Sequence, residues 1–330
     1  MLKFVLLILI SVSLNAKSCA VLLYHHFSDE MPKSTSISPK LFEQHLQYLQ
    51  VNEFKVLPLK TLLSKLKDND LPDRCVVLTT DDAYQSIYTN AYPLLKKYQM
   101  PMAVFVATQA IDKNYKAMMS WNQMREIQGE YVKFYNHTAA HSHLLDLNKA
   151  QVKTQIEQAQ NSLYQALGTT DKVLAYPYGE SNLSILKQVE ELDYIAFGQQ
   201  SGVVSKASDL QNLPRFPMAA NFAKMKSFQL KVNTLPMPLV KKRINPIIDK
   251  NPPMLNLTFE ISQSKPQQDG FNCFANGGVD INWKDDKNVE IVAKKPLMHR
   301  RNKYNCTMPS QSKEKYYWHS VQWINPSIAE

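Results

Sequence analysis

The sequence predicts an α/β protein followed by a small antiparallel β domain. Between residues 19 and about 220, short apolar runs rich in β-branched and aromatic residues alternate with amphipathic helical segments. This alternation is typical of βαβ units, which join parallel strands into a sheet or a barrel. Beyond about residue 255, apolar and polar residues alternate with the period of two that half-buried antiparallel strands show.

The clearest strand candidates end in residues that can carry chemistry. They cover residues 19–24, 75–80 and 131–136, and they lead into His25-His26, Asp81-Asp82 and the pair His137 and His141. Such runs read as buried parallel strands, and active sites in parallel α/β folds lie where these strands end. Further strand candidates cover residues 103–107, 173–176 and 194–197.

Helices are expected between these strands. Residues 39–50 carry apolar side chains at helical spacing, and residues 148–167 form a longer polar helix, capped by Asn148 and ended by Gly168. Prolines and the basic run 241–243 then indicate a linker.

We therefore divide the chain into four parts. These are a signal peptide over residues 1–18, the α/β part over 19–229, a Pro-rich basic linker over 230–254 and a small β domain over 255–330. Lys3, the apolar stretch 4–14 and Ala16 are typical of a secretory signal. A short membrane anchor or a buried first strand is the alternative, but the stretch is shorter than the roughly 20 residues that span a bilayer. We expect a secreted or periplasmic protein without a stable membrane span.

The cysteines support export. Cys19 and Cys75 each open an apolar run, seven residues before His26 and Asp82. If the two strands are adjacent and parallel, the sulfurs lie side by side and can form a disulfide, as oxidising compartments permit. Two buried free thiols are the alternative. A second bridge, Cys273 with Cys306, would close the small β domain.

Composition excludes some functions. Glycine is sparse, at 8 residues, and no GxGxxG or Walker motif is present, so a nucleotide cofactor is not expected. The formal charge of +9 indicates an anionic neighbour or simply a solvated basic surface. Nucleic acid is disfavoured, because no nucleic-acid motif accompanies the charge.

Two motifs suggest a metal site. His137 and His141 have i, i+4 spacing, which on a helical turn places both imidazoles on one face. This arrangement suits Zn²⁺ with a carboxylate as third ligand. Asp81 and Asp82 repel one another and are costly to bury unless a cation compensates them. A solvated turn or helix cap is the alternative for the aspartate pair.

Together these segments resemble the polysaccharide deacetylases, the NodB-homology group of carbohydrate esterases. The family's T-F-D-D-G-Y motif corresponds to Thr79-Thr80-Asp81-Asp82-Ala83-Tyr84, its H-[ST]-x-x-H motif to His137-Thr138-Ala139-Ala140-His141, and its aromatic-Pro-x-Gly turn to Tyr176-Pro177-Tyr178-Gly179. Residues 23–27 and 213–217 are similar to the branch that includes poly-N-acetylglucosamine deacetylases. The resemblance covers roughly residues 20 to 220.

The resemblance implies a distorted (β/α) barrel that removes N-acetyl, or alternatively O-acetyl, groups from a glycan. By motif, the implied metal ligands are Asp82, His137 and His141, and the metal is Zn, with Co or Ni as alternatives. Asp81 is then the general base and His25 the general acid, with His26 as its rival, since successive strand residues point oppositely. The Tyr84 N–H would stabilise an oxyanion, and Tyr178 would face the substrate.

Several residues depart from the family pattern. Ala83 replaces a glycine, which matters if that position needs a positive φ. Thr80 replaces an aromatic residue, and Ala175 stands where many members carry an arginine that orients the base, a role that Arg215 could take. His143 is either a supporting group of the site or an exposed side chain.

Three functions remain open from the sequence. The leading hypothesis is a metal-dependent deacetylase of an extracellular or cell-envelope polysaccharide, most simply an N-acetylglucosamine-type glycan. The alternatives are a catalytically weakened carbohydrate-binding pseudoenzyme of the same fold and an amidase acting on a non-carbohydrate acyl group. The aromatic residues near the C-terminus either fill a small β core or form a platform for sugar rings.

Overall fold

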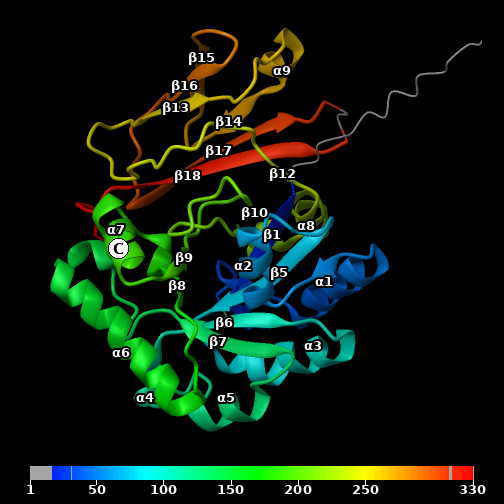
Figure 1. Cartoon of the computed structure of the whole chain (residues 1–330), viewed down its shortest axis with the longest axis vertical. Coiled ribbons are helices and arrows are strands. Elements are labelled where there is room, and N and C mark those ends of the chain that lie inside the picture. The colour runs from blue at the N-terminus through cyan, green and yellow to red at the C-terminus, as the bar shows by residue number, and fades with distance from the viewer. Residues whose placement is uncertain (1–16, 31, 312–313, 330) are drawn as a thin grey trace, which may run out of the picture.

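A curved, mostly parallel sheet forms the centre of the N-terminal part of the chain (Figure 1). The computed structural model describes residues 17–30, 32–311 and 314–329, so the predicted signal peptide lies, up to residue 16, outside the described residues. Hydrogen-bonded neighbours follow the order β10-β1-β5-β6-β7-β8-β9. The strand bounds are Ser18–Tyr24 (β1), Cys75–Asp81 (β5), Met102–Val106 (β6), Val132–Asn136 (β7), Val173–Ala175 (β8), Ile195–Phe197 (β9) and Val203–Ser205 (β10).

The register of the sheet confirms the predicted parallel strands. β1 runs parallel to β5, from Cys19 opposite Cys75 to Tyr24 opposite Thr80. β5, β6, β7, β8 and β9 continue in parallel, whereas β10 runs antiparallel to β1. Every residue of β5 is buried, because a central strand of a parallel sheet is covered on both faces. The carboxyl ends of these strands therefore meet at one rim.

A short segment closes the gap between β9 and β1. Leu213 bridges to Phe197 of β9, and Phe216 of β11 (Phe216–Pro217) lies opposite Leu22 of β1. The sheet thereby curls into the distorted (β/α) barrel that the sequence predicts. Arg215 stands in the middle of this closing segment and is fully buried.

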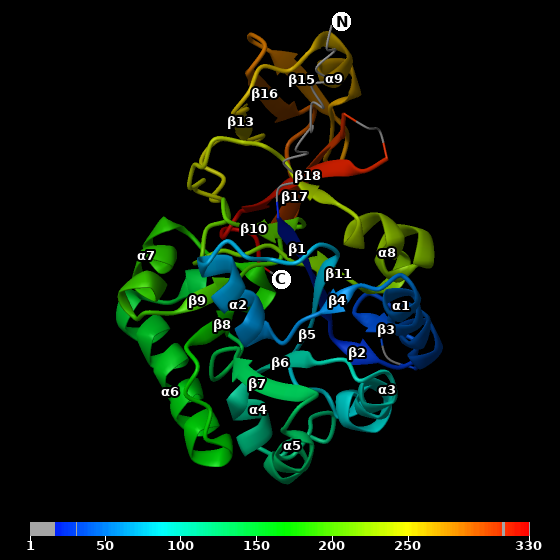
Figure 2. The ribbon, with the colours of Figure 1, turned by 45° about the vertical axis from the view of Figure 1, so that its right-hand side comes forward.

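Helices surround the sheet on its outer side (Figure 2). They are α1 (Pro39–Val51), α2 (Leu59–Lys67), α3 (Tyr92–Tyr98), α4 (Thr108–Asp112), α5 (Trp121–Ile127), α6 (Lys149–Leu167), α7 (Leu183–Glu191) and α8 (Met225–Val232). The two helices predicted from periodicity, α1 and α6, are confirmed, and Asn148 caps α6 by accepting a hydrogen bond from Gln151 N. None of the described helices is long and apolar enough to cross a membrane.

Three minor strands complete the N-terminal part. β4 (Lys55–Val56) pairs with β5, and β2 (His26–Phe27) pairs with β3 (Ser36–Ile37). The predicted disulfide between Cys19 and Cys75 is present and joins the first residues of the β1–β5 pairing, with 4.5 Å between the Cα atoms. It lies at the end of these strands opposite the rim that carries the histidines and aspartates.

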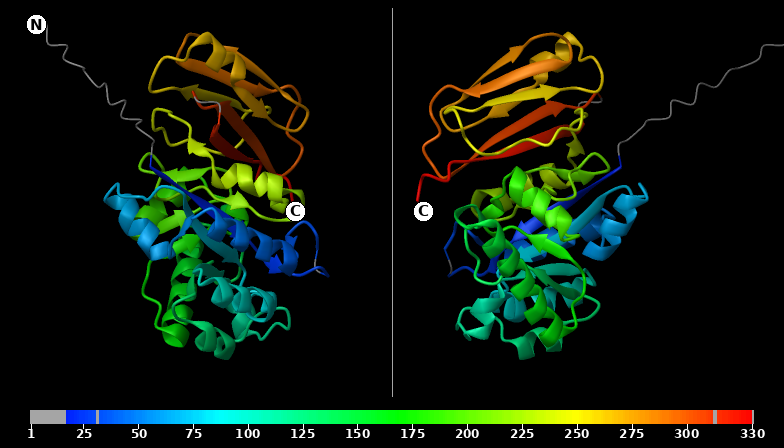
Figure 3. Two further views of the ribbon diagram at one scale, coloured as in Figure 1. Left: turned by 90° about the vertical axis from the view of Figure 1, so that its right-hand side faces the viewer. Right: turned by 60° about the vertical axis from the view of Figure 1, so that its left-hand side comes forward.

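The C-terminal part consists of two packed sheets, here named the C-terminal sandwich (Figures 1 and 3). One sheet has the order β12-β18-β17-β14 and the other β13-β16-β15. The bounds are Leu235–Pro236 (β12), Met254–Thr258 (β13), Asn272–Phe274 (β14), Val279–Trp283 (β15), Asn288–Ala293 (β16), Arg301–Pro309 (β17) and Tyr316–Ile324 (β18), with the helix α9 (Lys265–Gly270) before β14. The antiparallel β domain expected from the sequence is confirmed.

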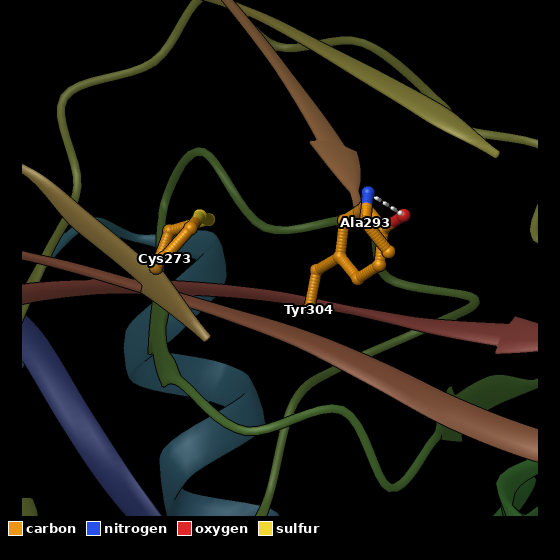
Figure 4. The surroundings of a disulfide bond; sticks show 4 residues. Cys273, Ala293 and Tyr304 are labelled. Carbon is orange, nitrogen blue, oxygen red and sulfur yellow. Dashed lines mark hydrogen bonds between the residues drawn. A yellow bond between two sulfur atoms is a disulfide. The ribbon is translucent and has the colours of Figure 1, made fainter. Parts of the chain in front are cut away.

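Two aromatic residues near the C-terminus lie in the core of the sandwich. Tyr304 is fully buried, and its hydroxyl accepts from Ala293 N at 2.8 Å (Figure 4). The same hydroxyl donates to Pro253 O at 2.9 Å. Trp323 is 4 % exposed in the same core, and the predicted Cys273–Cys306 disulfide joins β14 to β17 beside it. These residues fill a core and do not form an open platform for sugars.

The sheet of β17 and β18 packs directly on the N-terminal part. Alternate residues of β18 face opposite ways: Val321 and Trp323 enter the sandwich core, while Ser320 and Gln322 reach the barrel. Ser320 Oγ accepts from Ser201 N at 2.9 Å. The segment predicted as a linker contributes β12 to this sheet, which pairs in parallel with β18.

Candidate active site

The aspartate pair occupies the end of β5, in a sharply bent backbone. Asp81 is the last residue of the strand, and Asp82 and Ala83 follow with φ values of 74° and 62°. Left-handed conformation costs a residue with a Cβ about 1–2 kcal/mol. The replacement of the family's glycine by Ala83 therefore matters for the backbone, because this position does require a positive φ. The bend turns Asp82 out of the strand direction while Asp81 remains fully buried.

Asp81 is held by Arg215 in a closed ion pair. Arg215 donates from both terminal nitrogens to the two oxygens of Asp81, at 2.7 and 2.8 Å, and from Nε to Gly198 O at 3.0 Å. Both side chains are 0 % exposed. Burial opposes ionisation, but the Arg215 charge lowers the pKa of Asp81 to about 2. Asp81 is therefore ionised at neutral pH. Arg215 is the arginine partner of Asp81, as the sequence suggested when Ala175 was found in place of the usual arginine.

His137 follows β7 and is oriented by the neighbouring strand. Its Nδ1 lies 2.8 Å from Ala175 O at the end of β8, so Nδ1 donates its proton and Nε2 carries the lone pair. That Nε2 lies 3.6 Å from Asp82 Oδ1 and 3.8 Å from Asp81 Oδ2. The backbone carbonyl of Ala175 thus has a role that the identity of its side chain does not reveal.

His141 reaches the same place through an irregular loop. The segment from His137 to His141 is not helical, because Thr138 and His141 have φ values of 66° and 53°. The expectation of a helical turn is therefore wrong, although both imidazoles do converge. Asn136 supports the loop by accepting from Thr138 N at 2.8 Å and donating to Ile156 O at 2.9 Å. His141 Nε2 lies 3.4 Å from Asp82 Oδ1.

These three residues form a set that fits a metal ion. One ligand atom from each of Asp82, His137 and His141 lies within 4.8 Å of the others. Two imidazole nitrogens and one carboxylate oxygen suit Zn²⁺, and three protein ligands leave a position for water or substrate. The tautomer of His137, with its lone pair at Nε2, agrees with this arrangement.

Both histidines after β1 lie near the aspartates. His25 separates β1 from β2, and its charge contributes to lowering the pKa of Asp81. The His26 ring stacks on Tyr84 with 3.5 Å between centroids. Burial, and then His25, lower the pKa of His26. Because His25 lies between β1 and β2, the alternation of side chains along a strand does not determine whether His25 or His26 faces the site.

Tyr84 lies just beyond the bend that holds Asp82 and Ala83. Its bridge to Met118 is made by Met119 N donating to Ala83 O at 3.0 Å and Gln85 N donating to Ala117 O at 2.8 Å. These two bonds do not use the Tyr84 N–H. Burial, together with the Asp82 carboxylate, raises the pKa of the Tyr84 phenol, so the hydroxyl stays protonated.

Tyr178 lies against the second histidine of the set. It occupies a turn after β8 with a φ of 59°, and its ring is 4.5 Å from the His141 ring between centroids. The His143 ring stacks on it at 4.0 Å with an interplanar angle of 6°. His143 is therefore a supporting group of the site, and its Nδ1 lies 3.0 Å from Glu180 Oε2.

The sequence did not reveal the residues behind this turn. Glu180 is fully buried and binds Arg301, the first residue of β17, and Arg300, the residue before it. The only sequence signal was the position of Glu180 directly after the Pro-x-Gly turn. Its partners lie 120 residues farther on, and no local pattern connects them.

A separate cavity of about 480 Å³ lies between the barrel and the C-terminal sandwich. Gly179, Trp318 and Gln322 are among its lining residues, whereas Asp82, His137 and His141 are not. The turn that carries Tyr178 thus borders both the cavity and the histidine site.

Comparison with known proteins agrees with this geometry. Residues 68–197 match the family model described as polysaccharide deacetylase. This match assigns residues 68–197 to a polysaccharide deacetylase domain. A poly-β-1,6-N-acetyl-D-glucosamine N-deacetylase of Staphylococcus aureus is 28% identical over 208 residues, which cover 58% of this chain and 71% of the relative.

Solved structures share the fold of the deacetylase domain. The deacetylase PplD of Streptococcus pyogenes, solved in complex with acetate, superimposes with a TM-score of 0.62 at 26% identity, covering 66% of this chain and 99% of PplD. IcaB from Ammonifex degensii gives a TM-score of 0.59 at 21% identity, covering 64% of this chain and 97% of IcaB. The deacetylase fold thus accounts for about the share of this chain that precedes the C-terminal sandwich.

Proposed function

We propose that this protein is a metal-dependent hydrolase that removes N-acetyl groups from an N-acetylglucosamine-type polysaccharide outside the cytoplasm. The observation that carries the proposal is the joint placement of an ionised, buried Asp81 and the convergent set Asp82, His137 and His141. The named relative acts on such a glycan. The disulfides at Cys19–Cys75 and Cys273–Cys306 support an oxidising compartment.

Asp82, His137 and His141 would hold the metal. When bound, a divalent cation such as Zn²⁺ polarises the acetyl carbonyl and makes water a stronger acid. Asp82 Oδ1 lies between the two Nε2 atoms, at 3.6 Å from that of His137 and 3.4 Å from that of His141. The hydrogen bond from His137 Nδ1 to Ala175 O keeps its ring in the ligating orientation.

Asp81 would accept the proton of the attacking water. Arg215 occupies one direction at each oxygen of Asp81, and a carboxylate oxygen retains a further lone pair for a proton. The ion pair also fixes the carboxylate plane, so the base does not need to reorient during the reaction. His25 would return a proton to the leaving nitrogen, as general-acid catalysis requires. The Tyr84 N–H would stabilise the developing oxyanion, and Tyr178 would contact the sugar.

The decisive experiment measures acetate release from N-acetylglucosamine oligomers by the purified mature protein. Activity should disappear on chelation and return with added Zn²⁺, Co²⁺ or Ni²⁺. Asp81→Asn should abolish turnover while the protein still binds one metal ion, whereas His137→Ala should lose both activity and metal. Full turnover by metal-free protein, or by Asp81→Asn, contradicts the mechanism. Oligomer binding without any acetate release would support a carbohydrate-binding role.

A matched control separates the carboxylate pair from general damage. Asp209 is also paired with an arginine, Arg243, at 2.6 Å, but this ion pair is partly exposed, whereas that of Asp81 is fully buried. Asp209→Asn should therefore leave both deacetylation and metal binding close to wild type.

A further inference from the structure

The Tyr178 turn depends on contacts from a distant part of the chain. Tyr178 and Gly179 both have positive φ values, 59° and 68°. A Cβ added at Gly179 would lie 2.6 Å from the Cβ of Gln199, so the turn is tightly packed against the following loop. A strained conformation persists only where surrounding structure determines it.

Gln322 of β18 supplies part of that support. Its side chain is 5 % exposed, and its Nε2 donates to Tyr178 O at 3.0 Å and to Gly179 O at 3.1 Å. One amide of the C-terminal sandwich thus pairs two successive carbonyls of the barrel turn. Buried carbonyls without a partner are costly, so loss of this amide favours another turn conformation.

The ring of Tyr178 is held from the same direction. Arg301 Cζ lies 4.8 Å from the ring centroid, in the geometry of a cation–π contact. His143 and His141 of the barrel contact the ring as described above. The phenol thus lies between the sandwich and a proposed metal ligand.

Glu180 ties these groups together. Arg300 donates to its two oxygens at 2.9 and 3.1 Å, and Arg301 donates to Oε1 at 3.3 Å. His143 Nδ1 shares Oε2 at 3.0 Å. A single buried carboxylate therefore fixes both the arginines of the sandwich and the histidine that stacks on Tyr178.

We infer that the C-terminal sandwich is a working part of the active site: Gln322, Arg300 and Arg301 are positioning residues that hold Tyr178 as one wall of the glycan-binding groove. This inference rests on the proposed function. It gives the sandwich a specific role in recognising an extended sugar chain next to the acetyl group that is removed. The site of the barrel is incomplete without it.

Two substrates separate this role from the chemistry itself. An N-acetylglucosamine oligomer must contact the groove wall, whereas a small aryl acetate needs only the reacting centre. Gln322→Met keeps the side-chain volume and removes both hydrogen bonds. We expect it to lower kcat/KM for the oligomer by about tenfold or more through a raised KM, the scale of a lost net hydrogen bond. Aryl acetate hydrolysis and zinc affinity should stay within about twofold of wild type.

Ser320→Ala is the matched control. Ser320 lies two residues from Gln322 on the same face of β18 and also bonds the barrel, but at Ser201 N rather than at the carbonyls of the Tyr178 turn. This variant tests docking of the sandwich alone and should keep oligomer kinetics near wild type. Equal losses in Ser320→Ala and Gln322→Met would overturn the inference, because they would show general loosening.

The outcomes distinguish a failure of the proposed function from a failure of the role of the sandwich. A wild-type protein inactive on both substrates refutes the proposed function, and the inference falls with it. An active wild type with unchanged oligomer kinetics in Gln322→Met refutes the inference alone. If Gln322→Met does not fold, Arg301→Met decides, because its side chain is 25 % exposed and its removal leaves no buried cavity. A KM for the oligomer within twofold of wild type in Arg301→Met then overturns the inference.

Discussion

Arg215 allows the sharpest test of how the site is assembled. Arg215→Met keeps most of the side-chain volume but removes the two hydrogen bonds to Asp81, at 2.7 and 2.8 Å, and the bond to Gly198 O. Asp81 then remains buried without its counter-charge. Removing one partner of a buried ion pair costs about 3–5 kcal/mol. That is a large fraction of the roughly 5–15 kcal/mol by which proteins are stable.

A double-mutant cycle isolates the contribution of the pair. Asp81→Asn alone leaves a buried guanidinium unpaired and should cost a similar amount. The double variant leaves neither charge unpaired, so its loss should fall short of the sum of the single losses by about 2 kcal/mol or more. The assay is urea unfolding of metal-free protein at neutral pH, followed by circular dichroism, with the midpoint and slope compared among all four proteins.

Arg243→Met provides the control for this cycle. Arg243 also forms a two-nitrogen pair with a carboxylate, that of Asp209, but its side chain is 36 % exposed. Exposed pairs contribute about 0–1 kcal/mol, so this variant should unfold almost as wild type does. A strong buried pair between Arg215 and Asp81 is refuted if Arg215→Met costs no more than Arg243→Met. It is also refuted if the losses of Arg215→Met and Asp81→Asn are additive.

The remaining predictions concern strain, cross-linking and acid. Ala83→Gly should raise the free energy of unfolding by up to about 1 kcal/mol, because φ at this position is 62°; a destabilised variant in urea unfolding would contradict the assignment of strain. Replacing Cys19 and Cys75 by alanine opens a loop with a sequence separation of 56 and should cost about 4 kcal/mol, with kcat per folded molecule unchanged because the bond lies at the far end of the strands; a lower kcat would show coupling to the site. Burial lowers the pKa of His45 from 6.5 to about 4, so in this pH range the unfolded chain takes up a proton that the folded one does not. The free energy of unfolding should therefore decrease by about 3 kcal/mol as the pH is lowered from 6.5 to 4. Thermal unfolding across this range should show His45→Gln to be less acid-sensitive than wild type, and equal sensitivity would exclude His45 as the cause.

Local pattern alone predicted the elements and the positions of the reactive groups. The runs 19–24, 75–80 and 131–136 are strands because their continuous apolar, β-branched and aromatic residues suit burial on both faces. Parallel order then brings their carboxyl ends to one rim, so Asp82 and His137 were expected on the same side of the sheet. The facing positions of Cys19 and Cys75 follow from the same register.

The local geometry of the second histidine could not be predicted in this way. Spacing of four residues suggested a helical turn, whereas positive φ at Thr138 and His141 produces the convergence. Non-glycine residues adopt such φ values only where surrounding contacts compensate, here the hydrogen bonds of Asn136. Those contacts are set by α6, which lies beyond the motif.

The sequence by itself determined the fold class, the strand ends and the candidate residues for the chemistry, because periodicity and motif spacing are local properties of the chain. Only the tertiary structure decided which partner each of those residues has. Arg215 meets Asp81 across 134 positions, and Arg300 meets Glu180 across 120. Contacts of this kind depend on how the barrel closes and how the C-terminal sandwich packs on it. Burial then makes them strong, because water cannot replace either partner.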